Sequence, residues 1–430
     1  MRVRWRGVPT ATVPTPVRIL VVSTLYPPVA FGGYEVECSS VVERLRERNE
    51  VLVLTSDQER AKAGGQPDVR RELELLTPDA RGALRAPLAS WHAARAARRA
   101  LAWEPDLTYV WNGSEIPQAA LRVLADSGVP LAFRVCEHWF GSVFVADQFL
   151  RELLPSERRP GHAVWAAGCR AFNSLPSLRL SPTAPLRTAI SWNSEAIRRM
   201  VKVQPFIDPV LARVGHSVPR YGDLYAGVVR EPAPEPEIVF LGRVTPYKGV
   251  AVAIEAVALL RSRYGIPASL SLVGPEDPDH GTEMRQLAER LGVGAAVRWH
   301  GPTPPEQAAA LLARASAMIV PSTWREPFPL VTIEAGLARV PIVASDVGGI
   351  GEGMHDEEHA LLFAPGDAEA AAAALARTLR ESEPTAARVA RAHDRAQEFR
   401  LAPYLDEQER FVADALAALS DATGRTPGNG

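Results

Sequence analysis

Short runs of β-branched and other apolar residues alternate along this chain with longer segments rich in alanine, leucine and arginine. The alternation is typical of strand–helix units that feed a parallel sheet, because a parallel strand is buried on both faces and is followed by a helix. The pattern therefore predicts an α/β protein with two sheets. The predicted strands are residues 18–24, 51–56, 107–112, 130–137 and 188–194 in the first sheet and 237–243, 269–275, 296–302, 317–322 and 341–347 in the second.

Proline-rich chain separates the two series of strands. Residues 201–236 include EPAPEPE and show no clean period, so they predict an interdomain linker. The predicted organisation is a flexible tail over 1–17, an N-terminal domain over 18–205, a C-terminal domain over 206–400, a helix over 401–420 that packs back on the first domain, and a disordered tail over 421–430.

The composition argues against several classes of partner. With 48 basic and 50 acidic residues among 430, the formal charge is −2, which gives no global attraction to nucleic acid or to an anionic membrane. The three cysteines are scattered and show no CxxC pair, so neither a disulfide framework nor a zinc site is indicated. No apolar run approaches the roughly 18 residues that a transmembrane helix needs. A reducing cytoplasm fits these features best.

One basic segment leaves a peripheral membrane contact open. Residues 81–103 combine arginines with leucine and tryptophan, and such a segment lies on an anionic bilayer if its apolar residues share one face. The amphipathic helix of a globular domain has the same period and a solvated arginine face, and we favour that interpretation.

Two carboxylates follow the fourth predicted strand of the second sheet. Glu326 lies in the loop TWREPFP, and Glu334 lies one turn into a helix that we expect to start at Pro329, because proline is tolerated in a first turn. The amides of Leu330 and Val331 then form an anion site at the helix N-terminus. Ionised carboxylates accept O–H groups from vicinal diols, so the spacing predicts a pocket for a sugar, a diphosphate and a second sugar. Taken singly, Glu334 fits a solvated helix residue and Glu326 fits a helix-entry charge.

The loop GRVTPYKG, residues 242–249, supplies positive charge. It puts Arg243 at a strand end and Lys248 beside the next helix N-terminus, where Gly249 allows close approach. Two cations at the strand ends of one sheet suit a diphosphate. Alone, the two cations fit an ordinary solvated surface pair. Together with the carboxylates they favour a diphosphate site.

These motifs resemble those of a known family. Arg243–Gly249 resembles the G-R-x-x-x-x-K-G element, and Glu326–Glu334 the E-x7-E element, of retaining GT-B glycosyltransferases, with most similarity to glycosyltransferase family 4. Other segments are similar to the family's glycine-rich N-terminal loop and helix, its Ser-Glu strand end and its VGG-x-x-E turn: residues 23–45, 192–201 and 344–354. The resemblance covers roughly residues 18–385 and implies the GT-B fold, in which two Rossmann-like doubly wound domains face each other across a cleft.

The resemblance also implies a reaction. The family transfers a sugar, with retention of configuration, from a nucleotide diphosphate sugar to an acceptor by front-face attack. UDP is the commoner nucleotide and GDP the alternative. Neither a metal nor another cofactor is expected. The acceptor site is expected in loops of the first domain, including 138–159, whose aromatic residues suggest a partly apolar or ring-shaped acceptor. The Ala/Arg/Pro-rich composition, typical of high-GC bacteria, suggests by analogy a small-molecule, natural-product or glycan acceptor.

Residue roles follow from the same resemblance. Arg243 and Lys248 are expected to hold the donor diphosphate, and Glu334 the ribose hydroxyls. Glu326 is expected to face the transferred sugar, and His138 to approach it from the first domain. The remaining predicted donor-binding residues are Gly32 and Gly33 of the first domain and Phe328, Pro329, Leu330 and Val331 of the second.

The sequence also departs from the family. Pro327 and Pro329 stand where glycine is usual, so two amide donors are missing near the sugar. Relatives often carry an Asn-Gly turn where this chain reads RVGHSVPRYG, residues 213–222. The triplet from Asp277 to Asp279 has the DxD form that binds a divalent cation in a different glycosyltransferase fold, but in a Pro/Gly loop a solvated turn is favoured.

Two other functions share a nucleotide pocket. A GT-B sugar-nucleotide epimerase would use acid and base carboxylates at other places, and a noncatalytic protein would bind a sugar nucleotide without turnover. A dehydrogenase is disfavoured, because the first strand is followed by TLYPPVAFGGYE rather than by GxGxxG.

Overall fold

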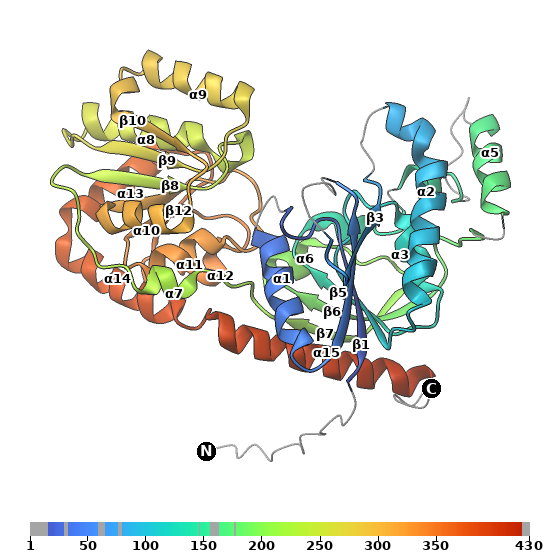
Figure 1. The fold of residues 1–430 in the computed structure, drawn as a ribbon. Helices are drawn as coiled ribbons and strands as arrows, with labels where there is room; N and C mark the ends of the chain where they lie inside the picture. Colours follow the sequence, from blue (N-terminus) through green and yellow to red (C-terminus); the bar gives the residue numbers. More distant parts are fainter. Residues whose placement is uncertain are drawn as a thin grey trace.

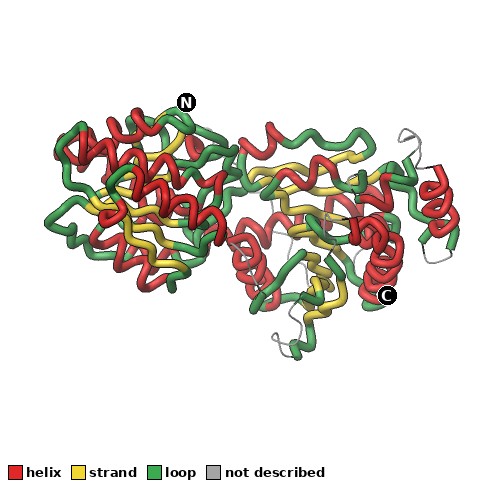
Figure 2. The backbone as a smooth tube through the Cα atoms, turned by 90° about the horizontal axis from the view of Figure 1, so that it is seen from above, coloured by secondary structure: helices red, strands yellow, loops and turns green. Residues whose placement is uncertain are grey.

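The chain folds into two α/β domains, each built on a parallel sheet, in the computed structural model (Figure 1). The structure describes residues 16–29, 33–58, 65–75, 80–145, 147–154, 163–175 and 178–423. Viewed from above, the strands of each domain lie between helices (Figure 2). The predicted tails over 1–17 and 421–430 lie largely outside these residues.

The N-terminal domain contains a seven-stranded sheet in the order β3-β2-β1-β4-β5-β6-β7, with parallel neighbours throughout. The strands are β1 (Arg18–Ser23), β2 (Glu50–Ser56), β3 (Val69–Leu73), β4 (Leu107–Asn112), β5 (Leu131–Val135), β6 (Leu186–Trp192) and β7 (Ile207–Val214). The helices are α1 (Gly33–Arg46), α2 (Ala80–Leu101), α3 (Gln118–Ala125), η1 (His138–Ser142), α4 (Gln148–Arg151), α5 (Ala163–Asn173) and α6 (Glu195–Met200).

The C-terminal domain contains a six-stranded parallel sheet in the order β10-β9-β8-β11-β12-β13. The strands are β8 (Glu237–Leu241), β9 (Ser269–Val273), β10 (Val297–Gly301), β11 (Ala317–Val320), β12 (Ile342–Ser345) and β13 (Leu361–Phe363). The helices are α7 (Gly222–Ala226), η2 (Pro246–Lys248), α8 (Val250–Ser262), α9 (Pro278–Arg290), η3 (Gly294–Ala296), α10 (Pro305–Arg314), α11 (Leu330–Leu337), α12 (Ile350–Gly353), α13 (Ala368–Arg380) and α14 (Ser382–Ala396).

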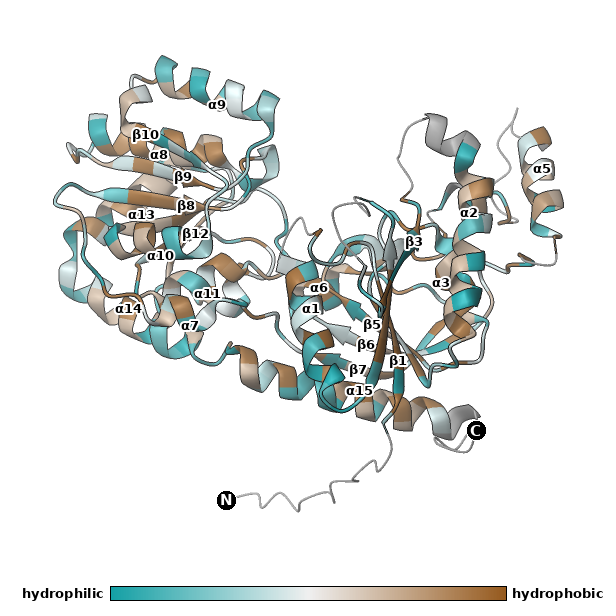
Figure 3. Ribbon diagram, viewed as in Figure 1, coloured by the Kyte–Doolittle hydropathy of each residue, from teal (hydrophilic) through white to brown (hydrophobic). Residues whose placement is uncertain are grey.

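Burial explains why the apolar runs became strands. The central strands β1, β4, β5 and β11 are buried along almost their whole length, as strands covered by helices on both faces must be. In Figure 3 the apolar colour gathers on the strands and on the helix faces turned toward them. All ten predicted strands are present, which confirms the prediction of two parallel sheets.

Helix α15 (Leu401–Thr423) returns to the N-terminal domain and runs beneath its sheet in Figure 1. The Tyr109 hydroxyl donates to Gln408 Oε1 of the helix at 2.9 Å, and Arg44 pairs with Asp406 at 2.7 Å. The Tyr404 hydroxyl donates to Glu37. The last helix of the chain is therefore part of the first domain's structure.

Three strands lie outside the predicted series, namely β3, β7 and β13. Strand β7 comes from the segment predicted as linker, so the first sheet continues past the boundary predicted at residue 205. It is an edge strand with Pro209 and mostly exposed or half-buried side chains, and such a strand shows no apolar run. Strand β3 reads VRREL, and β13 has only three residues.

The basic segment 81–103 forms helix α2, which buries a row of alanines, including Ala93, Ala97 and Ala100, in the domain core. Its arginines Arg95 and Arg98 face outward. This arrangement matches the domain helix that the sequence favours over a membrane-surface helix. Within the described residues, no helix is both long and apolar enough to span a bilayer.

Candidate functional site

A cavity of about 520 Å³ lies between the two domains. Its walls are the loops that follow β1, β4, β5 and β6 in one domain and β8 and β11 in the other. These are the carboxyl ends of parallel strands, where α/β proteins bind their ligands. Predicted site residues that line the cavity are Gly33, Arg243, Lys248, Glu326, Phe328, Pro329, Leu330 and Val331.

The loop after β8 brings Lys248 to the cavity through a glycine turn. Gly249 adopts φ of +69°, and a Cβ atom there would lie 1.8 Å from the carbonyl oxygen of Pro321, so only glycine fits. The turn therefore brings the end of η2 into close contact with the backbone that follows β11. The Tyr247 ring lies near both cations, 5.8 Å from Arg243 Cζ and 6.0 Å from Lys248 Nζ.

Lys248 and Glu326 meet directly at the wall of the cavity. Lys248 Nζ lies 2.6 Å from Glu326 Oε1, and the Ser322 hydroxyl donates to the same oxygen at 2.5 Å. The Glu326 side chain is only 4% exposed, and the two hydrogen bonds replace the water that burial removes from its Oε1. Both contacts use Oε1. The arrangement leaves Oε2 as the oxygen that can accept a ligand hydroxyl.

A second glycine turn fixes the backbone at Glu326. Gly348 has φ of +62°, and a Cβ atom there would lie 2.2 Å from the Glu326 carbonyl oxygen. The N–H of Gly349 donates to that carbonyl at 2.7 Å. The VGG element, which is far away in sequence, thus positions the first carboxylate of the E-x7-E element.

Helix α11 begins at Leu330, with Pro329 as its N-cap rather than in its first turn as predicted. Pro329 is extended, with ψ of 104°, and its carbonyl accepts the Thr332 hydroxyl at 2.9 Å. Leu330 and Val331 line the cavity at the helix N-terminus. Their amides belong to the first turn, where N–H groups lack helical partners, so they suit an anion.

Two predicted site residues, Glu334 and His138, lie outside the cavity lining, and a third is not among the described residues. Glu334 lies half-buried in α11, outside the cavity lining, and burial raises its pKa to about 7. His138 is exposed at the start of η1, with its ring 6.3 Å from that of Trp324, a lining residue. Gly32 lies outside the described residues.

The cavity also contains acidic residues that were not singled out in the sequence. Glu115 follows β4 and Glu137 follows β5, and both line the wall of the first domain. The pKa of Glu137 is raised, first by desolvation and then by the charge of Glu35, while Arg243 opposes the shift. The sequence did contain a signal for these two residues. Ligand-binding residues of α/β proteins follow the parallel strands, and each of these glutamates lies within three residues of a strand end.

A contact between the domains lies beside the cavity. Glu352, the acid of the VGG-x-x-E turn, accepts the backbone N–H groups of Glu195 and Ala196 at the start of α6, the first at 2.9 Å. Nε2 of His216 lies 3.3 Å from the same carboxylate. Burial opposes ionisation of Glu352, but these hydrogen bonds outweigh it and lower its pKa. The charged carboxylate therefore holds the two domains together.

Two residues at positions where this chain departs from the family lie at the same interdomain contact. His216, in the segment where relatives often carry Asn-Gly, packs its ring 4.9 Å from that of Phe328. The carbonyl of Pro327 accepts the Ser194 hydroxyl at 2.7 Å across the domain boundary. Proline lacks an N–H group, but its carbonyl still contributes to the interdomain contact.

We expect Glu352→Ala to shift the protein toward an open arrangement of its domains. Hydrogen bonds to a charged group are worth about 1.5–3 kcal/mol, so the closure equilibrium should change by roughly 10- to 100-fold. Small-angle X-ray scattering should show a larger radius of gyration. Glu358→Ala is the matched control, because Glu358 is exposed and its ion pairs join histidines of the same turn. Identical scattering from Glu352→Ala and the wild type would contradict the role of this contact.

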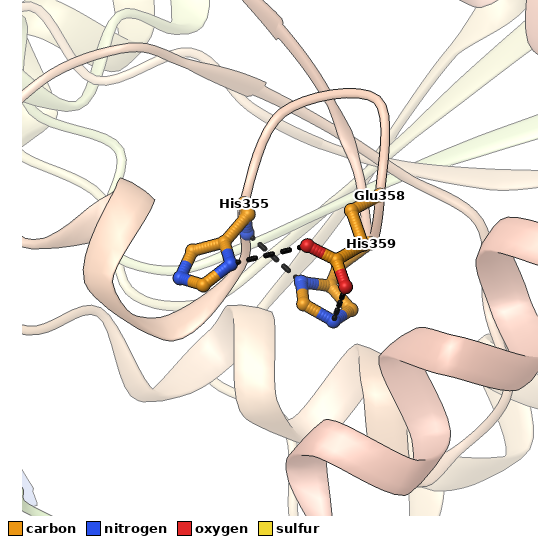
Figure 4. Close-up of side chains that lie close together, drawn as sticks. All are labelled: His355, Glu358 and His359. Carbon is orange, nitrogen blue, oxygen red and sulfur yellow. Dashed lines mark hydrogen bonds and ion pairs between the residues drawn. The ribbon is translucent and has the colours of Figure 1, made fainter.

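Two groups of possible metal ligands serve other purposes. Asp277 caps α9, since its Oδ1 accepts the N–H of His280 at 3.0 Å. Figure 4 shows His355, Glu358 and His359 close together on the turn before β13, within the described part of the chain. There Nδ1 of His359 accepts the backbone N–H of His355, so the proton of the neutral ring sits on Nε2 and faces Glu358. That tautomer suits a structural histidine better than a metal ligand.

Residues 225–395 match the family model described as glycosyl transferases group 1. A D-inositol 3-phosphate glycosyltransferase of Corynebacterium glutamicum is 34% identical over 185 residues, which are 42% of this chain and 44% of that protein. The glycogen synthase of Mycobacterium tuberculosis is 28% identical over 438 residues and 95% of each chain. The crystal structure of Anabaena HepE with UDP and glucose has a TM-score of 0.64 at 19% identity, over 93% of this chain and 100% of that one.

The structural likeness confirms the predicted GT-B fold, with two doubly wound domains facing each other across a cleft. The family match covers most of the second domain, where the cations and the E-x7-E element lie. This chain spans less than half of the length of the D-inositol 3-phosphate glycosyltransferases that it matches.

Proposed function

We propose that this chain is a retaining glycosyltransferase of family 4 that transfers a sugar from a nucleotide diphosphate sugar, with UDP favoured over GDP. The observation that carries the proposal is the meeting of Lys248 and Glu326 at the wall of an interdomain cavity. The Lys248 ammonium group suits a diphosphate, and the Glu326 carboxylate suits sugar hydroxyls. The family match over residues 225–395 and the UDP bound in the HepE crystal structure support it.

The chemistry of the site suits departure of a nucleotide diphosphate without a metal. Arg243, Lys248 and the first amides of α11 stabilise the negative charge that develops on the leaving group. Glu326 holds the transferred sugar, and His138 approaches it when the domains close. The acceptor hydroxyl attacks from the face that the diphosphate leaves, and a donor phosphate oxygen takes its proton. Domain closure excludes water from the reacting bond.

The acceptor is bound by the N-terminal domain, whose loops form the opposite wall of the cavity. The matched D-inositol 3-phosphate glycosyltransferases show by their name one acceptor class that relatives use. For this chain we propose a small-molecule, natural-product or glycan acceptor, and we place the reaction in the cytoplasm.

The proposal is tested by donor binding and donor turnover. UDP-sugars and GDP-sugars are screened for thermal stabilisation of the protein, and bound donors are then incubated with and without acceptors. We expect a UDP-sugar to stabilise the protein by about 2.7 kcal/mol at 100 times its dissociation constant. Binding without transfer or hydrolysis would identify a noncatalytic binding protein. Inversion at C2 of the donor without an acceptor would identify an epimerase.

The pH dependence of donor binding tests the role of Glu334. An ionised carboxylate accepts both ribose hydroxyls, whereas a protonated one has lost part of that capacity. Because burial raises the pKa of Glu334 to about 7, its ionised fraction falls roughly tenfold as pH drops from about 8 to about 6. We expect UDP-glucose affinity to fall with it. UDP-glucose suits the titration because its diphosphate is esterified at both ends.

The stability of the folded protein should rise as pH falls, which is opposite to the change in UDP-glucose affinity. The folded pKa of Glu334 lies above the usual 4.5, so the folded protein binds the additional proton between pH 4.5 and 7, and stability falls as pH rises through this window. The effect is about 3 kcal/mol, because each unit of pKa change is worth about 1.4 kcal/mol. Glu334→Gln is the control. It should abolish the part of the pH dependence of UDP-glucose affinity and of stability that comes from ionisation of Glu334. Donor binding that stays constant with pH in the wild type would contradict the ribose role.

A further inference from the structure

The two walls of the cavity differ in charge. The described lining residues of the first domain, which run from Thr24 to Ser217, include four glutamates and no lysine, arginine or histidine. The four are Glu35, Glu37, Glu115 and Glu137. The cations of the lining, Arg243 and Lys248, both come from the second domain. The one glutamate that the second domain adds to the described lining, Glu326, is paired with Lys248, so the other acidic residues of the described lining all belong to the first domain.

Glu37 is neutralised within the domain. Glu37 Oε1 lies 2.9 Å from the Arg134 guanidinium and accepts the Tyr404 hydroxyl, and both charged side chains are buried. Its charge serves the attachment of α15. Glu115 and Glu137, in contrast, form no ion pair with a basic side chain among the described residues, and both are exposed at the cavity wall.

The donor side has no cation to spare for an acceptor phosphate. Lys248 is already paired with Glu326, and the proposed diphosphate would occupy both Lys248 and Arg243. A bound donor would also add its own negative charge to the cavity. A phosphate ester on the acceptor would thus face Glu115, Glu137 and the donor diphosphate with no counter-charge.

We propose that the acceptor is a polyol that carries an amino group, bound as an ammonium ion by Glu115 and Glu137, and that phosphate esters are excluded. This inference rests on the proposed glycosyl transfer. Ionised carboxylates are acceptors only, and an ammonium group offers three donors together with the opposite charge. Hydroxyl groups of the same molecule satisfy the remaining carboxylate oxygens. Glucosamine, glucose and glucose 6-phosphate represent the ammonium, neutral and phosphate forms of one ring.

The test measures binding of these three sugars to the full chain saturated with UDP, by calorimetry or by ligand-observed NMR. We expect glucosamine to bind roughly tenfold more tightly than glucose, the ratio that one hydrogen bond between charged groups supplies. Glucose 6-phosphate should bind more weakly than glucose. Equal binding of glucosamine and glucose, tighter binding of the phosphate, or no detectable binding of glucosamine would overturn the inference.

Variants test whether Glu115 and Glu137 cause the preference for glucosamine. Glu115→Gln with Glu137→Gln keeps the size of both side chains and should abolish the preference for glucosamine. Glu50→Gln, an exposed glutamate at the far end of β2, is the control and should retain it. Retention of the preference in the double variant would overturn the assignment. UDP binding is measured in every sample, so loss of UDP binding contradicts the proposed function, whereas normal UDP binding without the preference contradicts only this inference.

Discussion

Glu326→Gln should lower the rate of sugar transfer by roughly 10²- to 10³-fold while nucleotide binding persists. The glutamine keeps the shape of the side chain and an oxygen for the Ser322 hydroxyl, but it removes the charge that Lys248 holds in place. The sugar then loses a fixed acceptor for its hydroxyls in the transition state. Steady-state kinetics with UDP-sugar, together with the dissociation constant for UDP, measure the two effects separately.

The matched control for this variant is Glu276→Gln. Glu276 belongs to the same domain and pairs with Arg285 outside the cavity lining, so its loss should leave turnover unchanged. A normal turnover number in Glu326→Gln would remove this residue from the reaction. A collapse of UDP binding would instead assign it to the nucleotide.

Lys248→Met should lower turnover by a similar roughly 10²- to 10³-fold, because the departing diphosphate loses a fixed cation. It should also destabilise the protein by about 2 kcal/mol, since the Glu326 carboxylate is left buried without its counter-ion. The two losses separate in the double variant with Glu326→Gln. That variant should regain stability, because no buried charge remains unpaired, but it should not regain activity.

Chemical denaturation and initial rates of the single and double variants complete this cycle. Lys202→Met is the control, because Lys202 is exposed and belongs to the first domain. Stability losses that simply add in the double variant would contradict the direct pairing of Lys248 with Glu326. Full activity in Lys248→Met would contradict the role of the cation at the diphosphate.

Local patterns were sufficient to predict most of the fold. Most of the ten predicted strands were recognisable because strands covered on both faces read as apolar runs, and the loops that follow them held most of the predicted site. Three of the four edge strands, β3, β7 and β13, were not recognisable, whereas the fourth, β10, was predicted. The sequence VRREL of β3 has no apolar run, although Arg71 within it is buried and donates to the carbonyls of Tyr26 and Pro27.

The arrangement of the site depended on contacts that no local pattern contains. The capture of the α6 amides by Glu352 joins residues more than 150 positions apart. The acidic wall of the cavity gathers Glu115 and Glu137 from two different strand ends. A single glutamate after a strand is indistinguishable in sequence from a solvated one. Only the fold brings such residues to one surface.

The position of α15 has a consequence for how the protein is made. The strands of the first domain leave the ribosome long before α15 is synthesised, because the second domain lies between β7 and α15 in the sequence. Until then the apolar surface around Tyr109 that Phe411 later covers is open to water. The first domain should therefore mature last, after the second, and its nascent form is the stage at which a chaperone would find exposed apolar surface.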